Sequence, residues 1–290
     1  MILVLGAAGQ LGATIVERLR RRTGAPEAAA LIALTRRELD VADARAVGDA
    51  IRRHGPALIV NCTAYNDVDG AEEDATTALS VNAFAVQAMA RGAAEVDATL
   101  VHYSTDFVFD GETDRPYREE DRARPLSAYG ASKLLGEWFA ADAPRHYVLR
   151  VESLFGGPAA RSSFDKIIAG LVAGRDVAVF SDRIVSPSYV EHVADATLAL
   201  VSRRAAGGVY HCVNTGATTW YDAARHIATR LGAPQSLLKP VSINDVTLRA
   251  RRPRYCALAN EKLRRAGVSM PRWEDALTRY VDKTLPGIGS

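Results

Sequence analysis

The chain has 290 residues, 48% of them hydrophobic, which is enough to bury the core of one large domain or of two unequal lobes. A formal net charge of +2, from 36 basic and 34 acidic residues, gives no sign of a nucleic-acid-binding surface. Three cysteines without close spacing argue against a disulfide framework and a CxxC metal site, and no apolar run reaches the ~18 residues of a membrane span. We therefore expect a cytoplasmic globular protein with no nucleic-acid or membrane partner, and we assign no metal.

The first 22 residues predict a strand, a tight turn and a helix. "MILVLG" is a short apolar run, glycines follow at positions 6, 9 and 12, and Leu11, Ile15 and Leu19 then share one helical face. Glycines let the backbone approach a pyrophosphate, which the free N–H groups of a helix N-terminus can bind. The spacing is GxxGxxG and not the usual GxGxxG, but its place after a first strand favours a dinucleotide site over an empty turn.

A second predicted strand, "AALIALTRR" (29–37), follows the Ala-rich stretch "GAPEAAA" (24–30), which we interpret as a loop. This strand should end beside the adenosine ribose of the cofactor. An Asp or Glu there binds the 2′-hydroxyl of NAD, whereas an Arg can bind the 2′-phosphate of NADP. Arg36 is our preferred ligand and NADPH the expected cofactor. If Arg36 and Arg37 are only solvent-exposed loop residues, NADH is the alternative.

The next segments alternate between strands and helices. A helix is expected after Asp40, a strand leads into a polar loop over "ALIVNCTAYNDVDGAEED" (57–74), and a long helix covers 78–96. "TLVHYSTDFVFDG" (99–111) is the next strand. This alternation predicts an α/β fold with a Rossmann-type, doubly wound parallel sheet. Ligands of such sheets lie beyond the carboxyl ends of the strands, where Gly9, Thr63, Thr105 and Tyr129 should meet.

The stretch "YGASK" places Tyr129 and Lys133 four residues apart, and therefore on one face of a helix. The chain has 31 arginines but only five lysines, so a lysine here hints that an ammonium group is specifically required. A nearby cation lowers the pKa of a phenol, and Lys133 could also bind the nicotinamide ribose. Tyr129 would then protonate a carbonyl oxygen as hydride arrives from NADPH, with Thr105 as a second hydrogen-bond donor to that oxygen.

Beyond residue 160 the pattern is looser. Residues 162–180 and 219–241 predict amphipathic helices, and "GGVYHCVNTG" (207–216) predicts a strand that returns to the main sheet. We therefore expect an NAD(P)-binding Rossmann domain over 1–160, joined by a strand near 208–214. Residues 161–290 would form mainly a smaller, substrate-binding lobe.

Several of these motifs occur together in one known family. The stretches "GAAGQLG" (6–12), "STDFVFDG" (104–111), "YGASKLLGE" (129–137) and "LRVESLFG" (149–156) resemble extended short-chain dehydrogenases/reductases, and among them the dTDP-4-dehydrorhamnose reductase family. The resemblance runs along nearly the whole chain. It implies NADPH-dependent reduction of the 4-keto group of a nucleotide-linked, dTDP-type 6-deoxyhexose, with Thr105, Tyr129 and Lys133 as the catalytic set. It also implies that the substrate side is lined by Val68, Asp69, Asp106 and Phe107.

The expected cofactor contacts are Gly6, Gly9, Gln10, Leu11, Gly12, Arg36, Asp40, Val41, Cys62, Thr63, Ala64, Tyr65, Tyr129 and Lys133. The sugar side departs from the family pattern, since Ser153 stands where the family has a tryptophan and Arg183 where it has a glutamine. Two other functions stay open. The chain could be an NADP-binding regulatory subunit that acts through a protein partner, resembling the regulatory subunit of methionine adenosyltransferase, or a nucleotide-sugar epimerase or dehydratase. A homodimer is also left open.

Overall fold

The computed structural model describes residues 1–22, 31–158 and 162–285. Its largest sheet has six parallel strands in the order β10-β5-β4-β3-β1-β2. These strands are β1 (Ile2–Leu5), β2 (Leu31–Leu34), β3 (Leu58–Asn61), β4 (Thr99–Thr105), β5 (Arg145–Val151) and β10 (Gly208–His211). The predicted Rossmann-type parallel sheet is confirmed, and the strand expected within 207–216 pairs with β5. The loop expected at 24–30 and the start of the second strand lie outside the described residues.

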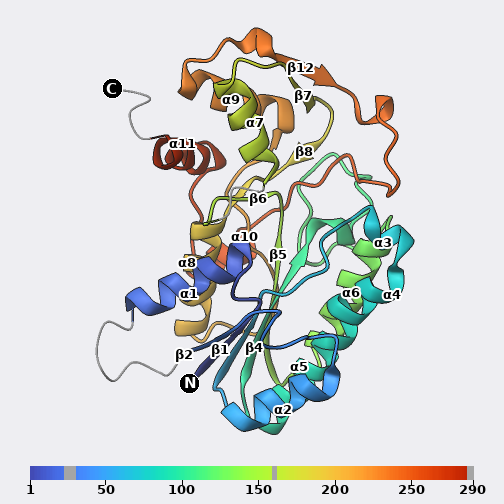
Figure 1. Cartoon of the computed structure of the whole chain (residues 1–290), viewed down its shortest axis with the longest axis vertical. Coiled ribbons are helices and arrows are strands. Elements are labelled where there is room, and N and C mark those ends of the chain that lie inside the picture. Colours follow the sequence, from blue (N-terminus) through green and yellow to red (C-terminus); the bar gives the residue numbers. More distant parts are fainter. Residues whose placement is uncertain (23–30, 159–161, 286–290) are drawn as a thin grey trace.

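Helices cover both faces of this sheet (Figure 1). Successive strand residues point to opposite faces, so Val4 packs toward α1 (Gln10–Arg22) and α8 (Val190–Ser202). Leu3 and Leu5 pack instead toward α2 (Ala44–His54), α5 (Ala85–Glu95) and α6 (Ala128–Ala140). The sheet is therefore buried on both sides, as the apolar strand sequences predicted.

The single long helix predicted over 78–96 is divided. Its segments are α4 (Ala75–Leu79), a π-helical turn η1 (Ser80–Phe84) and α5, preceded by α3 (Gly70–Glu73). The carbonyl oxygen of Asn82, in the π-turn, lies against Gly136 of α6. A Cβ added at Gly136 would lie only 2.1 Å from that oxygen. This close approach holds the α5 and α6 segments together beneath the site described below.

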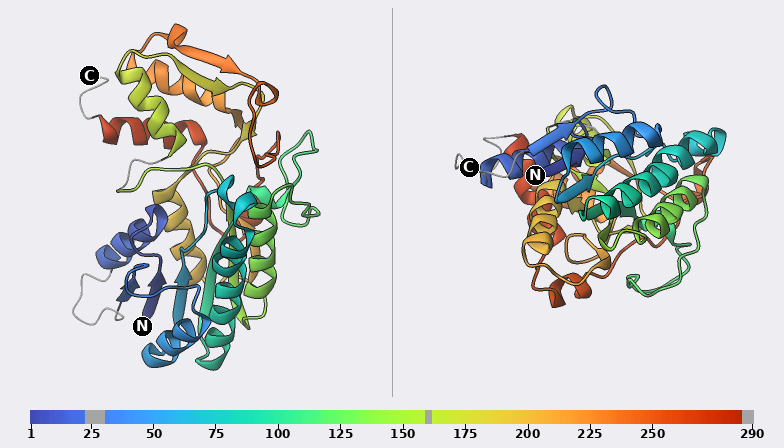
Figure 2. Two further views of the ribbon diagram at one scale, coloured as in Figure 1. Left: turned by 45° about the vertical axis from the view of Figure 1, so that its right-hand side comes forward. Right: turned by 90° about the horizontal axis from the view of Figure 1, so that it is seen from below.

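The smaller lobe lies beyond one end of the sheet (Figures 1 and 2). It is built from α7 (Ser163–Val172), β7 (Val177–Phe180), α9 (Trp220–Leu231), β12 (Leu238–Val241) and α11 (Trp273–Thr284). The helices predicted over 162–180 and 219–241 are therefore too long. Gly174 (φ +64°) and Gly232 (φ +65°) follow their ends in left-handed conformations, and the remaining residues form β7 and β12, which pair in parallel.

The remaining elements are short. They are η2 (Asp106–Val108), β6 (Leu154–Phe155), β8 (Ile184–Val185), β9 (Ser188–Tyr189), β11 (Thr218–Thr219), η3 (Gln235–Leu237), η4 (Ile243–Asp245) and α10 (Glu261–Arg265). β6 pairs with β9, and β8 pairs with β11. Over the described ranges, we find no helix long and apolar enough to cross a membrane.

Candidate active site

The glycine-rich turn after β1 packs too tightly for larger residues. Gly6 has φ +75°, and a Cβ there would lie 2.9 Å from the backbone of Cys62. A Cβ on Gly12 would lie 2.2 Å from the carbonyl oxygen of Gly6. The turn thus brings the start of α1, at Gln10, close to the carboxyl ends of β1 and β3. This is the geometry in which a helix N-terminus can receive a pyrophosphate.

A cavity of about 500 Å³ opens beside this turn, where the strand order reverses between β1 and β3. Ligands of doubly wound sheets bind at such a switch point. The predicted cofactor contacts that line it are Gly6, Gly9, Arg36, Asp40, Val41, Cys62, Thr63, Ala64 and Tyr65. The others in the turn are engaged elsewhere: the Gln10 amide donates to the Gly156 carbonyl at 2.8 Å, Leu11 is buried in the core, and Gly12 packs on Gly6.

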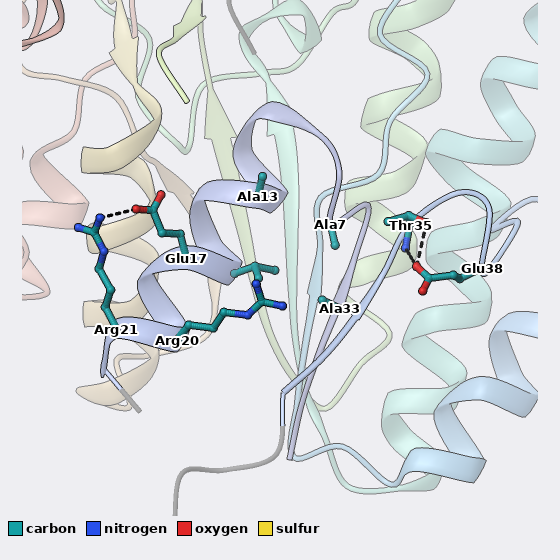
Figure 3. Close-up of a pocket in the computed structure, with 9 residues that line it drawn as sticks. Ala7, Ala13, Glu17, Arg20, Arg21, Ala33, Thr35 and Glu38 are labelled. Carbon is teal, nitrogen blue, oxygen red and sulfur yellow. Dashed lines mark hydrogen bonds and ion pairs between the residues drawn. The ribbon is translucent and has the colours of Figure 1, made fainter. Parts of the chain in front are cut away.

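Two charged residues, Glu38 and Arg36, follow the end of β2 and face different cavities. The Glu38 carboxylate accepts hydrogen bonds from the backbone N–H and hydroxyl of Thr35, both at 2.8 Å, and faces a neighbouring cavity between α1 and β2 (Figure 3). These bonds lower the pKa of Glu38. Arg36 is exposed and lines the cofactor cavity itself. An arginine therefore lies at the end of β2, where an arginine of this type of fold can bind a 2′-phosphate.

Two buried asparagines hold the loop that follows β3, and the sequence reasoning missed both. The Asn61 side-chain oxygen accepts from the N–H of Thr63 at 3.0 Å and from its hydroxyl at 2.6 Å. Asn82 bonds the N–H and the carbonyl of Tyr65, each at 2.9 Å. The sequence did carry a signal for them, since each lies in a mostly apolar stretch, "IVNC" or "SVNA". An amide in such a stretch must find hydrogen-bond partners once it is buried.

Thr105 and Tyr129 meet at the carboxyl end of β4. Thr105 is the last residue of β4, and Tyr129 lies in the first turn of α6, which Ser127 caps through a bond to the Gly130 N–H. Both side chains are buried, and they lie close enough for the Thr105 hydroxyl to affect the pKa of the Tyr129 phenol. Lys133 lies one turn further along α6, where its ammonium group donates to the carbonyl of Tyr103 at 2.6 Å. The predicted trio is thus brought to one place.

The expected effect of Lys133 on Tyr129 is wrong for this state of the protein. Burial raises the pKa of Tyr129 to about 12, although the nearby Thr105 hydroxyl opposes the rise. Burial also lowers the pKa of Lys133 to about 8, against the attraction of Glu137. The ammonium group bonds a backbone carbonyl instead of the phenol, so loss of hydration dominates both groups. Tyr129 is therefore fully protonated at neutral pH and ready to donate.

The four residues expected on the substrate side differ in how they lie relative to Tyr129. Val68 and Phe107 pack in its apolar cluster, and the Phe107 and Tyr129 rings meet edge to face with centroids 5.7 Å apart. Asp69 instead pairs with Arg252 at 2.6 Å, across the gap between the two lobes. Asp106 is buried and accepts from the Thr105 hydroxyl at 2.9 Å. Tyr65 joins the apolar cluster to the cofactor cavity, because it contributes to both.

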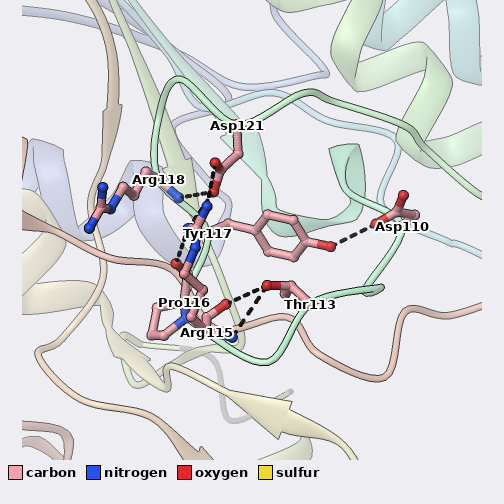
Figure 4. Close-up of polar contacts among 7 residues, drawn as sticks. All are labelled: Asp110, Thr113, Arg115, Pro116, Tyr117, Arg118 and Asp121. Atoms are coloured by element: carbon pink, nitrogen blue, oxygen red, sulfur yellow. Dashed lines mark hydrogen bonds and ion pairs between the residues drawn. The ribbon is translucent and has the colours of Figure 1, made fainter.

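Hydrogen bonds and ion pairs hold the loop between η2 and α6 in place (Figure 4). Arg115 forms two bonds to the Asp121 carboxylate, each 2.8 Å, and the Tyr117 hydroxyl donates to Asp110 at 2.7 Å. The Tyr117 ring also stacks on Phe109 with centroids 4.0 Å apart. Since this loop connects Thr105 to Tyr129, these contacts fix the two halves of the site relative to each other.

The site combines a cavity at the switch point that suits a dinucleotide with a buried threonine and tyrosine beside it. This fold and site are those of an NAD(P)H-dependent oxidoreductase of the short-chain dehydrogenase/reductase type.

The family model described as "RmlD substrate binding domain" matches residues 1–285, and the chain belongs to that family. It is 36% identical to dTDP-4-dehydrorhamnose reductase of Mycobacterium tuberculosis H37Rv over 98% of this chain and 96% of the relative. A crystal structure of a dTDP-4-dehydrorhamnose reductase from Clostridium acetobutylicum superposes with a TM-score of 0.91 at 30% identity, covering 98% and 99% of the chains. The Bacillus anthracis enzyme in complex with NADP gives 0.90 at 30% identity, covering 97% and 98%.

Proposed function

We propose that this protein reduces the 4-keto group of a nucleotide-linked, dTDP-type 6-deoxyhexose with NADPH. The observation that carries the proposal is the pair of buried hydroxyls, Thr105 and Tyr129, which lie close enough to interact at the carboxyl edge of the sheet, beside the cofactor cavity. The relatives named above, which are called dTDP-4-dehydrorhamnose reductases, support the choice of substrate. The NADP bound in the Bacillus anthracis structure supports the choice of cofactor. Three free cysteines suit the reducing cytosol, where we place the reaction.

Tyr129, Thr105 and Lys133 have different roles in the proposed reduction. Bound NADPH supplies the hydride. Tyr129 donates its phenolic proton to the ketone oxygen, which its raised pKa allows because the group stays protonated at neutral pH. Thr105 lies beside the phenol, and its hydroxyl, which donates to Asp106 in this structure, would turn to the ketone oxygen as a second donor. Lys133 carries the positive charge that favours the phenolate once Tyr129 has given up its proton.

The remaining assignments concern binding. We assign the cofactor to the cavity lined by the glycine turn, Arg36 and the loop of residues 62–65. The sugar would lie between Val68, Phe107 and the smaller lobe, with Asp69 and Asp106 as its polar contacts. Arg36 would bind the 2′-phosphate, so NADPH would be preferred to NADH.

The test is NADPH oxidation, followed by its absorbance, against a panel of nucleotide-linked 4-keto-6-deoxy sugars. We expect one NADPH consumed per sugar reduced, and a rate at least ~100-fold lower for Tyr129→Phe with cofactor affinity nearly intact. Tight cofactor binding without oxidation by any sugar would contradict the proposal and favour a regulatory subunit. Sugar conversion without net NADPH consumption would favour an epimerase or dehydratase.

A further inference from the structure

Three buried side chains that can bind a metal ion converge next to Thr105. Asp106 follows β4, Glu152 follows β5, and Cys256 lies in the segment after η4, with exposed fractions of 4%, 2% and 1%. One ligand atom of each, a carboxylate oxygen or the sulfur, lies within 4.8 Å of the other two. We call these three residues the Cys256 cluster. No local spacing indicates it, because the three residues lie far apart in the sequence.

The Glu152 carboxylate gives an independent indication of a ligand. Its Oε2 accepts the N–H of Ser186 at 2.6 Å. Its Oε1 is buried and has no hydrogen-bond partner among the residues that the structure describes. This carboxylate is the one that lies within 4.8 Å of the Asp106 and Cys256 ligand atoms. A buried carboxylate oxygen without a donor is costly, so it favours a positively charged ligand within the cluster.

The other two side chains can bind an ion while most of their surroundings stay in place. Asp106 accepts the Thr105 hydroxyl through Oδ1 at 2.9 Å, so its Oδ2 can bind an ion without breaking that bond. The Cys256 thiol donates to the Pro253 carbonyl at 3.3 Å, and this proton would pass to solvent when the sulfur binds a metal. Arg183 donates to the same sulfur at 3.4 Å, which would help to hold a metal-bound thiolate.

The balance of charge favours a divalent cation. Two carboxylates and a thiolate carry three negative charges, and the buried guanidinium of Arg183 beside them carries one positive charge. A divalent ion would bring this group to zero net charge, which avoids the cost of an uncompensated charge away from water. Protons on the thiol and on one carboxyl group would give the same balance, and the zinc content of the protein distinguishes the two states.

The ligand types select among the divalent ions. Zn²⁺ accepts a soft thiolate together with carboxylates, whereas Mg²⁺ and Ca²⁺ prefer oxygen ligands alone. With metal–ligand distances of about 2.0–2.3 Å, the ligand atoms around a tetrahedral zinc ion lie roughly 3.3–3.8 Å apart. The spacing of 4.8 Å or less in the Cys256 cluster is therefore too wide by at most about 1.5 Å, which small side-chain rotations can close.

We propose that Asp106, Glu152 and Cys256 bind a zinc ion, with a water molecule as the fourth ligand. The ion has a structural role, because it ties the ends of β4 and β5 to the segment after η4. That segment also carries Arg252, which pairs with Asp69 across the gap between the two lobes. Zinc binding would thus strengthen the connection between the lobes. The site goes beyond the proposed function and does not depend on it.

The zinc content of the full-length protein tests the site directly, without cofactor or sugar. After equilibration with micromolar Zn²⁺ and removal of free metal, mass spectrometry of the elements should find one zinc ion per wild-type chain. Glu152→Gln and Cys256→Ala should lower zinc affinity at least about 10-fold. The matched control is Cys212→Ala, which removes a buried thiol outside the cluster and should keep the zinc. A wild-type protein without zinc, or equal zinc in all four proteins, would overturn the proposal.

Two further measurements show whether the sulfur binds the ion and whether the ion stabilises the fold. With Co²⁺ in place of Zn²⁺, a thiolate-to-metal absorption band should appear in the wild type and in Cys212→Ala but not in Cys256→Ala. Zinc at 100-fold above its Kd should raise the wild-type Tm by about 5 °C and leave that of Cys256→Ala nearly unchanged. If Cys256→Ala does not fold, Glu152→Gln decides through its Tm shift. No band and no Tm shift in the wild type would overturn the proposal, whatever the protein does with NADPH and a sugar.

Discussion

A buried ion pair beneath the active site should be essential for stability. The Arg150 guanidinium of β5 forms two bonds to the Glu137 carboxylate of α6, at 2.8 and 2.7 Å, and both side chains are at most 5% exposed. The Ser104 hydroxyl of β4 donates to the same carboxylate at 2.6 Å. Glu137 therefore ties together the helix that carries Tyr129 and the strand that carries Thr105. We choose Glu137→Gln as the perturbation, because it preserves shape and removes charge.

The expected loss can be worked out from this geometry. In Glu137→Gln the Arg150 charge stays buried, with the Phe109 ring at 4.9 Å and the His211 imidazole at 3.4 Å as its other neighbours. Burial lowers the pKa of His211 to about 3, so this ring is neutral and supplies no negative charge in place of Glu137. Breaking a buried pair on one side costs about 3–5 kcal/mol of unfolding free energy. The double variant Glu137→Gln/Arg150→Met, which removes both charges, should be more stable than the single one.

Urea unfolding of the wild type, both single variants and the double variant gives the coupling energy. Asp121→Asn is the control, because its pair with Arg115 has equally short bonds but a half-exposed arginine, and its loss should cost no more than about 1 kcal/mol. A cost for Glu137→Gln as small as that of the control, or a double variant no more stable than the single ones, would refute the reasoning.

Three further predictions concern the cofactor turn and the contact between the lobes. Gly12→Ala should lower NADPH affinity at least about 10-fold, because the added Cβ would lie 2.2 Å from the Gly6 carbonyl oxygen. Fluorescence titration measures this affinity, and an unchanged value would mean that the turn relaxes freely. Arg36→Ala should weaken NADPH binding about 10-fold or more and NADH binding much less. Equal losses of affinity for the two cofactors would contradict the 2′-phosphate assignment. Hydrogen bonds from Arg252 and from the Ala250 N–H lower the pKa of Asp69 to about 2, below the ~3.9 of a free aspartate. This contact therefore stabilises the fold above about pH 4 and is lost as pH falls toward 2, so Asp69→Asn should be less stable than wild type at pH 7 and equally stable near pH 2.

Local sequence patterns were sufficient for the features that depend on neighbouring residues. The turn containing Gly6 and Gly12, the strand and helix around it, and the helical spacing of Tyr129 and Lys133 all follow from short-range rules. The lobe was less well predicted, because Gly174 and Gly232 were not taken as helix ends although glycine commonly occupies that position. Attention to these two residues would have separated β7 and β12 from the helices.

Features that depend on burial could not be inferred in this way. The sequence does not show that Lys133 bonds the Tyr103 carbonyl, nor that loss of hydration raises the pKa of Tyr129. Asp106, Glu152 and Cys256 belong to three separate segments, which only the folded chain brings together. Among the residues that the structure describes, Glu152 Oε1 has no hydrogen-bond partner, which is also a result of packing.

The central claim is that this chain transfers hydride from NADPH to the keto carbon of a nucleotide-linked sugar while Tyr129 supplies the proton. The most direct measurement is single-turnover reduction with NADPH deuterated at the transferring position, with Tyr129→Phe in parallel. The account predicts stoichiometric NADPH oxidation, one deuterium on C4 of the product sugar, and almost none of either in the variant. Equal rates in both proteins would contradict the role of Tyr129, and a product without deuterium at C4 would contradict the reductase itself.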